Sequence, residues 1–207
     1  QMCIRDRDKG GPMTSNAVSH IIKELKADKR NQGYTDQSIP PVFQVDPAVK
    51  ILMIGQAPGR KVQETLIPFD DPSGDRLRSW LGIDKETFYS TEIGILPMDF
   101  YYPGKGKSGD LAPRSFIAKE YHPALLEIMN QVDLTLLIGN YAIKYYLKED
   151  RQKNLTETVR HYEDYLPEYF PLVHPSPLNF RWHKKNPWFE KEIVPALQEK
   201  VGHILGK

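Results

Sequence analysis

The fold is indicated most clearly by one segment, Ile51-Leu52-Met53-Ile54-Gly55-Gln56-Ala57-Pro58-Gly59. A short apolar run that ends in a turn is typical of a strand buried on both faces, as in a parallel sheet. The glycines after it allow the backbone to approach a ligand closely, and free N–H groups there can hold a carbonyl or an anion. A simple turn is the alternative interpretation, because loops with Gly and Pro are common.

Similar apolar segments recur along the chain, and helical patterns lie between them. The further strands are predicted around Phe88-Tyr89-Ser90, at residues 134–138 and at residues 170–173. Helices are predicted at residues 14–29, 75–81, 115–129, 141–147 and 187–204. This alternation of strands and helices predicts an α/β domain.

The last predicted strand is followed by His174-Pro175-Ser176-Pro177. Two prolines stiffen this loop and fix the direction of His174. Because open α/β sheets bind ligands outside the carboxyl ends of their strands, this loop and the Gly55–Gly59 loop should meet at one edge. A structural histidine beside a rigid turn is the alternative.

Composition limits the classes of protein that the chain can represent. With 207 residues, 40% hydrophobic and 27% charged, it suits one globular domain, and no apolar run reaches the roughly 20 residues of a membrane span. Residues 1–12 look like a non-native leader, so we expect a single domain at residues 13–207. The only cysteine, Cys3, lies in that leader, so we expect no disulfide, metal or iron–sulfur cluster and a cytoplasmic location. Acidic and basic residues balance outside the leader, so any nucleic-acid binding needs a local basic face.

Together, the Gly-Gln-Ala-Pro-Gly and His-Pro-Ser-Pro loops resemble motifs of the uracil-DNA glycosylase superfamily. Its best-known branch carries Gly-Gln-Asp-Pro-Tyr and His-Pro-Ser-Pro, and the resemblance extends over residues 50–197. The segments at residues 96–106 and 186–189 look like a little-characterised branch without an iron–sulfur cluster. The resemblance implies a three-layer α/β/α sandwich with a central four-stranded, mainly parallel sheet. It also implies a monomeric DNA glycosylase without a cofactor, which flips uracil or a related deaminated base and hydrolyses its N-glycosidic bond.

The resemblance also implies roles for individual residues. His174 corresponds to the catalytic histidine that donates a hydrogen bond to the uracil O2, and Phe69 to the stacking aromatic. The backbone of Gln56 and Ala57 corresponds to the loop that meets the base and the attacking water. Thr91, near the place of a uracil-reading asparagine, and Ser176 complete the predicted base-binding set.

The chain departs from the family where a carboxylate activates water. The best-known branch has Asp at the position of Ala57, and the iron–sulfur branch has Glu at the position of Gln56. The nearest carboxylates are Asp70 and Asp71, and another branch takes its aspartate from this same turn. We therefore predict that Asp71 is catalytic. Its alternative role is to cap a helix that begins near Ser73.

Residues after the histidine motif enter the DNA minor groove in this family, so we predict a wedge at residues 178–182. The predicted DNA contacts are Asn179, Arg181, Trp182, Lys184 and Lys185, with the cationic side chains on phosphates. Packing of Phe180 and Trp182 in the core is the alternative. The loop at residues 105–109 either adds a phosphate contact or is an ordinary surface loop. A catalytically silent nucleic-acid-binding protein and an unrelated nucleotide-handling enzyme are the alternative functions.

Overall fold

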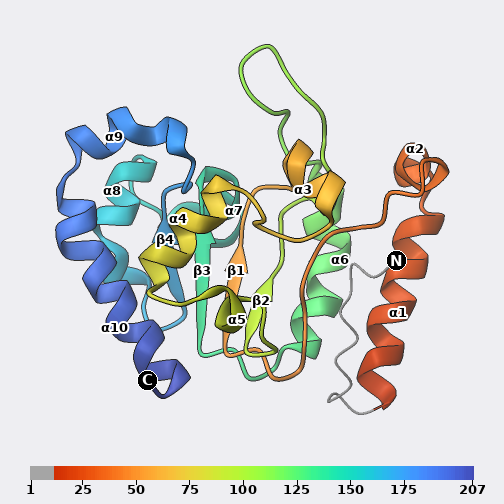
Figure 1. Cartoon of the computed structure of the whole chain (residues 1–207), viewed down its shortest axis with the longest axis horizontal. Coiled ribbons are helices and arrows are strands. Elements are labelled where there is room, and N and C mark those ends of the chain that lie inside the picture. Colours follow the sequence, from red (N-terminus) through yellow and green to blue (C-terminus); the bar gives the residue numbers. More distant parts are fainter. Residues whose placement is uncertain (1–11) are drawn as a thin grey trace.

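The structure, a computed structural model, describes residues 12–207 (Figure 1). Most of the segment expected to be a leader, including Cys3, lies outside the described residues. The α-helices are α1 (Pro12–Ala27), α2 (Gln32–Asp36), α3 (Arg60–Thr65), α4 (Pro72–Leu81), α5 (Lys85–Phe88), α6 (Ser115–Ile128), α7 (Asn140–Leu147), α8 (Leu155–Arg160), α9 (Phe180–Lys185) and α10 (Val194–Leu205). Shorter helical turns are η1 (Lys29–Asn31), η2 (Lys148–Asp150), η3 (Tyr162–Tyr165), η4 (Pro177–Asn179) and η5 (Phe189–Ile193).

A four-stranded sheet forms the centre of the molecule. Its strands are β1 (Ile51–Ile54), β2 (Ile93–Ile95), β3 (Leu134–Ile138) and β4 (Tyr169–Leu172), in the order β2-β1-β3-β4. Every neighbouring pair is parallel, which confirms the predicted α/β class and central sheet. All carboxyl ends of the strands therefore meet at one edge, the upper edge in Figure 1.

Alternate side chains of β1 enter two separate cores, one on each face of the sheet. Ile51 and Met53 pack into the core that lies under α4 and α10. Leu52 and Ile54 pack into the core that lies under α1 and α6. The sheet is thus covered by helices on both faces, in the predicted three-layer arrangement (Figure 1).

The second strand lies later in the chain than predicted. Phe88 ends the short helix α5 instead of starting a strand, because Asp84 caps that helix by accepting a hydrogen bond from the Thr87 N–H over 2.8 Å. The true strand β2 contains Gly94, where an added Cβ would lie 2.9 Å from Cγ1 of Val49. Close packing against Val49 thus requires a glycine at position 94. Because glycine is uncommon inside strands, it makes β2 harder to predict from the sequence.

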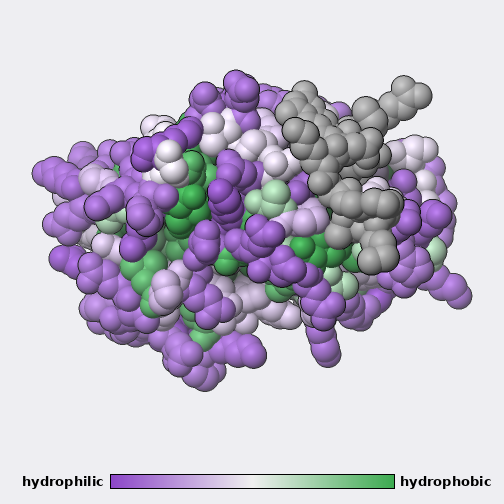
Figure 2. Space-filling model, turned by 90° about the horizontal axis from the view of Figure 1, so that it is seen from below, coloured by the Kyte–Doolittle hydropathy of each residue, from purple (hydrophilic) through white to green (hydrophobic). Residues whose placement is uncertain are grey.

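The two edges of the sheet differ in character. Figure 2 views the amino edge from below, and hydrophilic side chains dominate it, with hydrophobic side chains in a few separate groups. The long loop between β2 and α6 projects beyond the opposite, carboxyl edge (Figure 1). Within residues 12–207, none of the helices has both the length and the apolar character that a membrane crossing requires.

Candidate active site at the carboxyl edge of the sheet

A pocket of about 310 Å³ lies at the carboxyl edge and is lined by both predicted loops. This volume is at the small end of the range for ligand pockets. Apolar lining comes from Val42, Val62, Phe69, Ile95, Leu111 and several prolines. The polar lining residues are Gln56, Asp71, Ser73, Asp110, His174 and Ser176. Segments far apart in the sequence thus close around one small cavity, as the motifs predicted.

The loop after β1 is anchored to the chain that leaves β2. The Met98 N–H donates to the Gly55 carbonyl over 2.9 Å, and the Asp99 N–H donates to the Gln56 carbonyl over 3.1 Å. These bonds hold Gln56 and Ala57 on the pocket wall. Their contact with a base stays a prediction.

Phe69 is fixed in an unusual backbone conformation beside this loop. Its φ is +56°, a left-handed value that costs a non-glycine residue of this kind about 1–3 kcal/mol. Gly74 makes the turn possible, because a Cβ there would lie 1.8 Å from the Phe69 carbonyl oxygen. The Phe69 ring lies close against Gly55, since a Cβ added to that glycine would be 3.4 Å from Cζ of the ring.

Two residues that sequence reasoning did not identify hold the Phe69 turn. The buried Arg78 donates from Nη1 to the Phe69 carbonyl over 3.3 Å, and Tyr89 donates from Oη to the Pro68 carbonyl over 2.8 Å. Arg78 also donates to Tyr89 Oη over 3.3 Å. This network maintains the strained turn, so the position of the aromatic ring is built into the fold.

Asp71 takes the position of a helix cap and also lines the pocket. Its Oδ1 accepts a hydrogen bond from the Gly74 N–H over 2.8 Å at the start of α4. The alternative interpretation, capping, therefore holds in the structure. It does not remove the carboxylate from the pocket, because one oxygen suffices for the cap.

His174 is held as a neutral imidazole of defined tautomer. Burial lowers the pKa of His174, and the negative charges of Asp71 and Asp110 oppose this effect in part. The Ser176 N–H donates to Nδ1 over 3.1 Å. Because Nδ1 accepts, the single ring proton of the neutral form lies on Nε2.

Asp110 is a pocket carboxylate that sequence reasoning missed. It belongs to the loop at residues 102–111, which leaves the carboxyl end of β2 and returns toward α6. The sequence feature that indicates Asp110 is its position in a loop after a strand, since such loops border the ligand site of a parallel sheet. The misplaced second strand concealed that feature.

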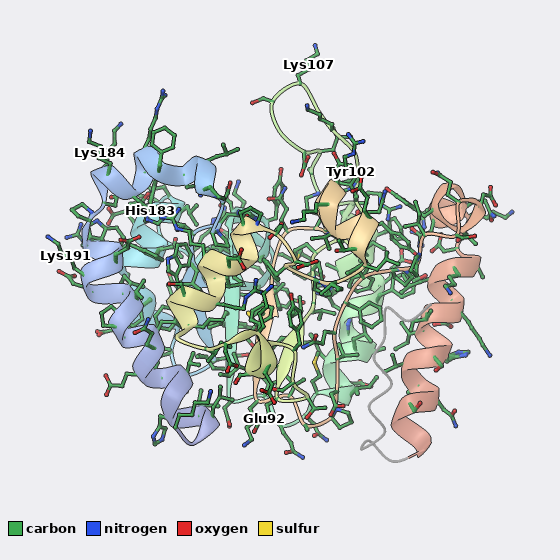
Figure 3. All side chains as sticks on the ribbon, in the orientation of Figure 1. Glu92, Tyr102, Lys107, His183, Lys184 and Lys191 are labelled. Carbon is green, nitrogen blue, oxygen red and sulfur yellow. The ribbon has the colours of Figure 1, made fainter. Side chains whose placement is uncertain are left out.

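Thr91 does not line the pocket, and two predicted DNA contacts, Asn179 and Trp182, make hydrogen bonds within the protein. Thr91 precedes β2 and so lies at the amino edge, where Figure 3 labels its neighbour Glu92, far from the pocket. Asn179 uses its side-chain Nδ2 to donate to the His174 carbonyl over 2.8 Å, so it supports the histidine loop. Trp182 is half-buried, and its Nε1 donates to Thr156 Oγ1 over 2.9 Å. This bond favours the packing alternative for Trp182, and its contact with DNA stays a prediction.

Other residues beside the pocket are free to meet a large ligand. Leu178 and Phe180 are 84% and 60% exposed, an unusual state for large apolar side chains. Arg181, Lys184 and Lys185 are exposed on α9. Figure 3 shows Lys184 on α9 and Lys107 at the tip of the projecting loop, both at the carboxyl edge. Cationic side chains thus lie on two elements at the carboxyl edge of the sheet.

Within the part of the chain that the structure describes, no three His, Cys, Asp or Glu side chains are arranged to hold a metal ion.

Comparison with known proteins agrees with the motifs. A family model described as the uracil DNA glycosylase superfamily matches residues 42–198. Among solved structures, the chain is similar to the solution NMR structure of a proposed uracil DNA glycosylase from Methanosarcina acetivorans. The two are 16% identical with a TM-score of 0.47, and the match covers 77% of this chain and 93% of the other. Because the family match spans most of the chain, including both pocket loops, the protein belongs to the uracil DNA glycosylase superfamily.

Proposed function

We propose that this protein is a DNA glycosylase that hydrolyses the N-glycosidic bond of uracil or a related deaminated base. The observation that carries the proposal is the meeting of His174, Phe69 and Asp71 around one small pocket. Removal of such a base would be the first step of base excision repair.

His174 is suited to stabilise the leaving base. Cleavage of the glycosidic bond leaves negative charge on the base, and a fixed donor for that charge lowers the barrier. The neutral imidazole presents its Nε2–H as this donor. One donor of this kind is typically worth roughly 3 to 4 kcal/mol, or about 100- to 1000-fold in rate.

Asp71 is suited to stabilise the sugar. The same bond cleavage leaves positive charge on the sugar ring, and a nearby carboxylate offsets it. The cap at α4 fixes the position of the Asp71 carboxylate. The Phe69 ring, close against Gly55, would stack on the base and exclude water from one of its faces.

The surroundings of the pocket suit a flipped nucleotide. Extrusion of a base from a duplex costs a few kcal/mol, and inserted apolar side chains offset part of this cost. Leu178 and Phe180 are exposed directly after the histidine loop and are available for insertion. Arg181, Lys184 and Lys185 would contact the phosphates.

Incubation of the protein with oligonucleotides that carry uracil, hypoxanthine, xanthine or hydroxymethyluracil tests the proposal. Alkali cleaves the strand wherever a base has been removed, and we expect cleavage at one or more of these bases. The matched variant His174→Ala should bind the same DNA but release the base much more slowly. DNA binding without cleavage of any oligonucleotide would instead indicate a catalytically silent binding protein.

A further inference from the structure

Asp110 is held at the mouth of the pocket by an ordered loop. The Gly106 N–H donates to the Gly109 carbonyl over 2.8 Å, and the Leu111 N–H donates to the Gly104 carbonyl over 2.8 Å. Lys105 and Asp110 form an antiparallel bridge. The loop is thus a closed hairpin, and Asp110 and Leu111 both line the pocket from it.

An ion pair with a buried carboxylate fixes the base of this hairpin to the first motif loop. Asp99, which is fully buried, accepts hydrogen bonds from Arg114 Nε over 2.8 Å and from Arg114 Nη2 over 2.9 Å. Asp99 also donates from its backbone N–H to the Gln56 carbonyl. The two ends of the hairpin are therefore tied together and to the pocket wall, which places Asp110 in a reproducible position.

The location of Asp110 matches the place where the water must attack. A flipped base enters the pocket, but its sugar stays at the mouth because both of its phosphates remain in the DNA strand. The attacking water must lie beside the sugar carbon, and so also at the mouth. Asp110 is exposed there and lines the pocket at the same time.

The hydrogen bonds of the two carboxylates suggest different roles. Asp71 Oδ1 accepts from the Gly74 N–H within the helix cap, which makes Asp71 a fixed anion. Among the residues that the structure describes, the Asp110 side chain accepts one hydrogen bond, from Tyr102 Oη to Oδ1, over a longer distance of 3.2 Å and from the same loop. Asp110 therefore retains acceptor capacity for a water molecule.

We propose that Asp110 is the carboxylate that aligns and deprotonates the attacking water, and that Asp71 provides fixed negative charge beside the sugar. This assignment rests on the proposed glycosylase function. In the step, the water oxygen bonds to the sugar carbon as the carbon–nitrogen bond breaks. The electron pair of that bond leaves with the base, and the water proton passes to the Asp110 carboxylate. His174 holds the anionic base by its Nε2–H, and solvent then protonates the base.

The test is single-turnover release of base by the full chain under saturating protein, with DNA affinity measured in parallel. Asp110→Asn should lose about 100-fold or more in rate, the usual contribution of a general base, with unchanged affinity. Tyr102→Phe removes the hydrogen bond that Asp110 accepts and should cause only a small fraction of that loss. Asp164→Asn, at an exposed aspartate before β4 on the opposite edge, should release base at the rate of the unsubstituted protein.

Each contrary result has a distinct meaning. An Asp110→Asn rate within threefold of the unsubstituted rate would overturn the role of Asp110 and leave the glycosylase function in place. Equal losses in Asp110→Asn and Tyr102→Phe would show that Asp110 only holds the loop, which also overturns the assignment. If the unsubstituted protein releases none of the tested bases, both the function and the assignment fail.

Discussion

The backbone N–H of Ser176 donates a hydrogen bond to Nδ1 of His174 over 3.1 Å. This bond orients the ring and forces the proton of the neutral imidazole onto Nε2. Burial lowers the pKa of His174, so the neutral form persists at neutral pH. The His174-Pro175-Ser176-Pro177 loop thus determines both the direction and the protonation state of its histidine.

Replacement of Ser176 tests this hydrogen bond. Ser176→Pro removes the N–H, and the φ of Ser176, −59°, already suits a proline ring. We expect Ser176→Pro to slow base release strongly, because the tautomer is no longer fixed. Ser176→Ala keeps the N–H and removes only the hydroxyl, so its loss should be much smaller. Equal rates for the two variants would argue against control of the tautomer by this bond.

Asp71→Asn separates the charge of Asp71 from its structural role. Asparagine caps helices about as well as aspartate, so the free energy of unfolding should change by less than about 0.5 kcal/mol. Base release should fall strongly, because the neutral amide no longer offsets positive charge on the sugar. Thermal unfolding and single-turnover assays measure the two effects. Unchanged base release would remove Asp71 from the mechanism.

The two central strands could be predicted from the sequence, and the second strand in chain order could not. Residues 51–54 and 134–138 form continuous apolar runs, which central parallel strands require on both faces. In β2, Gly94 interrupts the pattern because its neighbours leave no space for a side chain. The nearby apolar residue Phe88 favours a strand in the sequence, although in the structure it packs from the end of α5.

One error in the site, the placement of Thr91 at the pocket, is consistent with that misplaced strand. A strand that ended at Ser90 would have put Thr91 at the pocket, whereas the true strand puts Pro97 and Asp110 there. His174, Phe69 and the Gly55–Gly59 loop were found because their motifs are local in the chain. The pairing of Trp182 with Thr156 depends on tertiary contacts between α9 and α8, which no local pattern reveals.

The exposed pair Leu178 and Phe180 is expected to assist base flipping. Replacement of both by Ala should slow base release from a duplex, where unstacking costs a few kcal/mol, much more than from single-stranded DNA. The ratio of the two rates is the measurement. Tyr145→Ala, which removes another exposed aromatic ring from α7, is the matched control and should leave that ratio unchanged. An equal effect on both substrates would refute insertion of these side chains.

Cationic residues at the carboxyl edge are expected to set the salt dependence of DNA binding. Arg181→Ala, Lys184→Ala and Lys107→Ala should each weaken binding across sequences. Each should also reduce the slope of log affinity against log salt by about 0.9 if it removes one phosphate contact. Lys191→Ala, on the flank below α9 in Figure 3, is the control and should keep the full slope. Binding that does not respond to salt would contradict a DNA interface on this edge.

Buried His122 should make the free energy of unfolding depend on pH. His122 bonds through Nε2 to the carbonyl of Pro97, a pocket residue, over 2.8 Å, and through Nδ1 to the Tyr146 hydroxyl. Burial lowers the pKa of His122 to about 4, whereas an unfolded histidine titrates near its usual value of about 6.5. Between these values the unfolded state binds more protons, so stability falls as the pH decreases through this window, by up to about 3 kcal/mol.

Urea denaturation from neutral pH down to about pH 4 measures this dependence. His122→Gln removes the titrating group, so its stability should vary less with pH than that of the unsubstituted protein, even though it is less stable at neutral pH. The exposed His20 offers the matched control, because His20→Gln replaces a histidine that is not buried and leaves His122 in place. Parallel stability curves for the His122 variant and the unsubstituted protein would show that His122 does not resist protonation in the folded state.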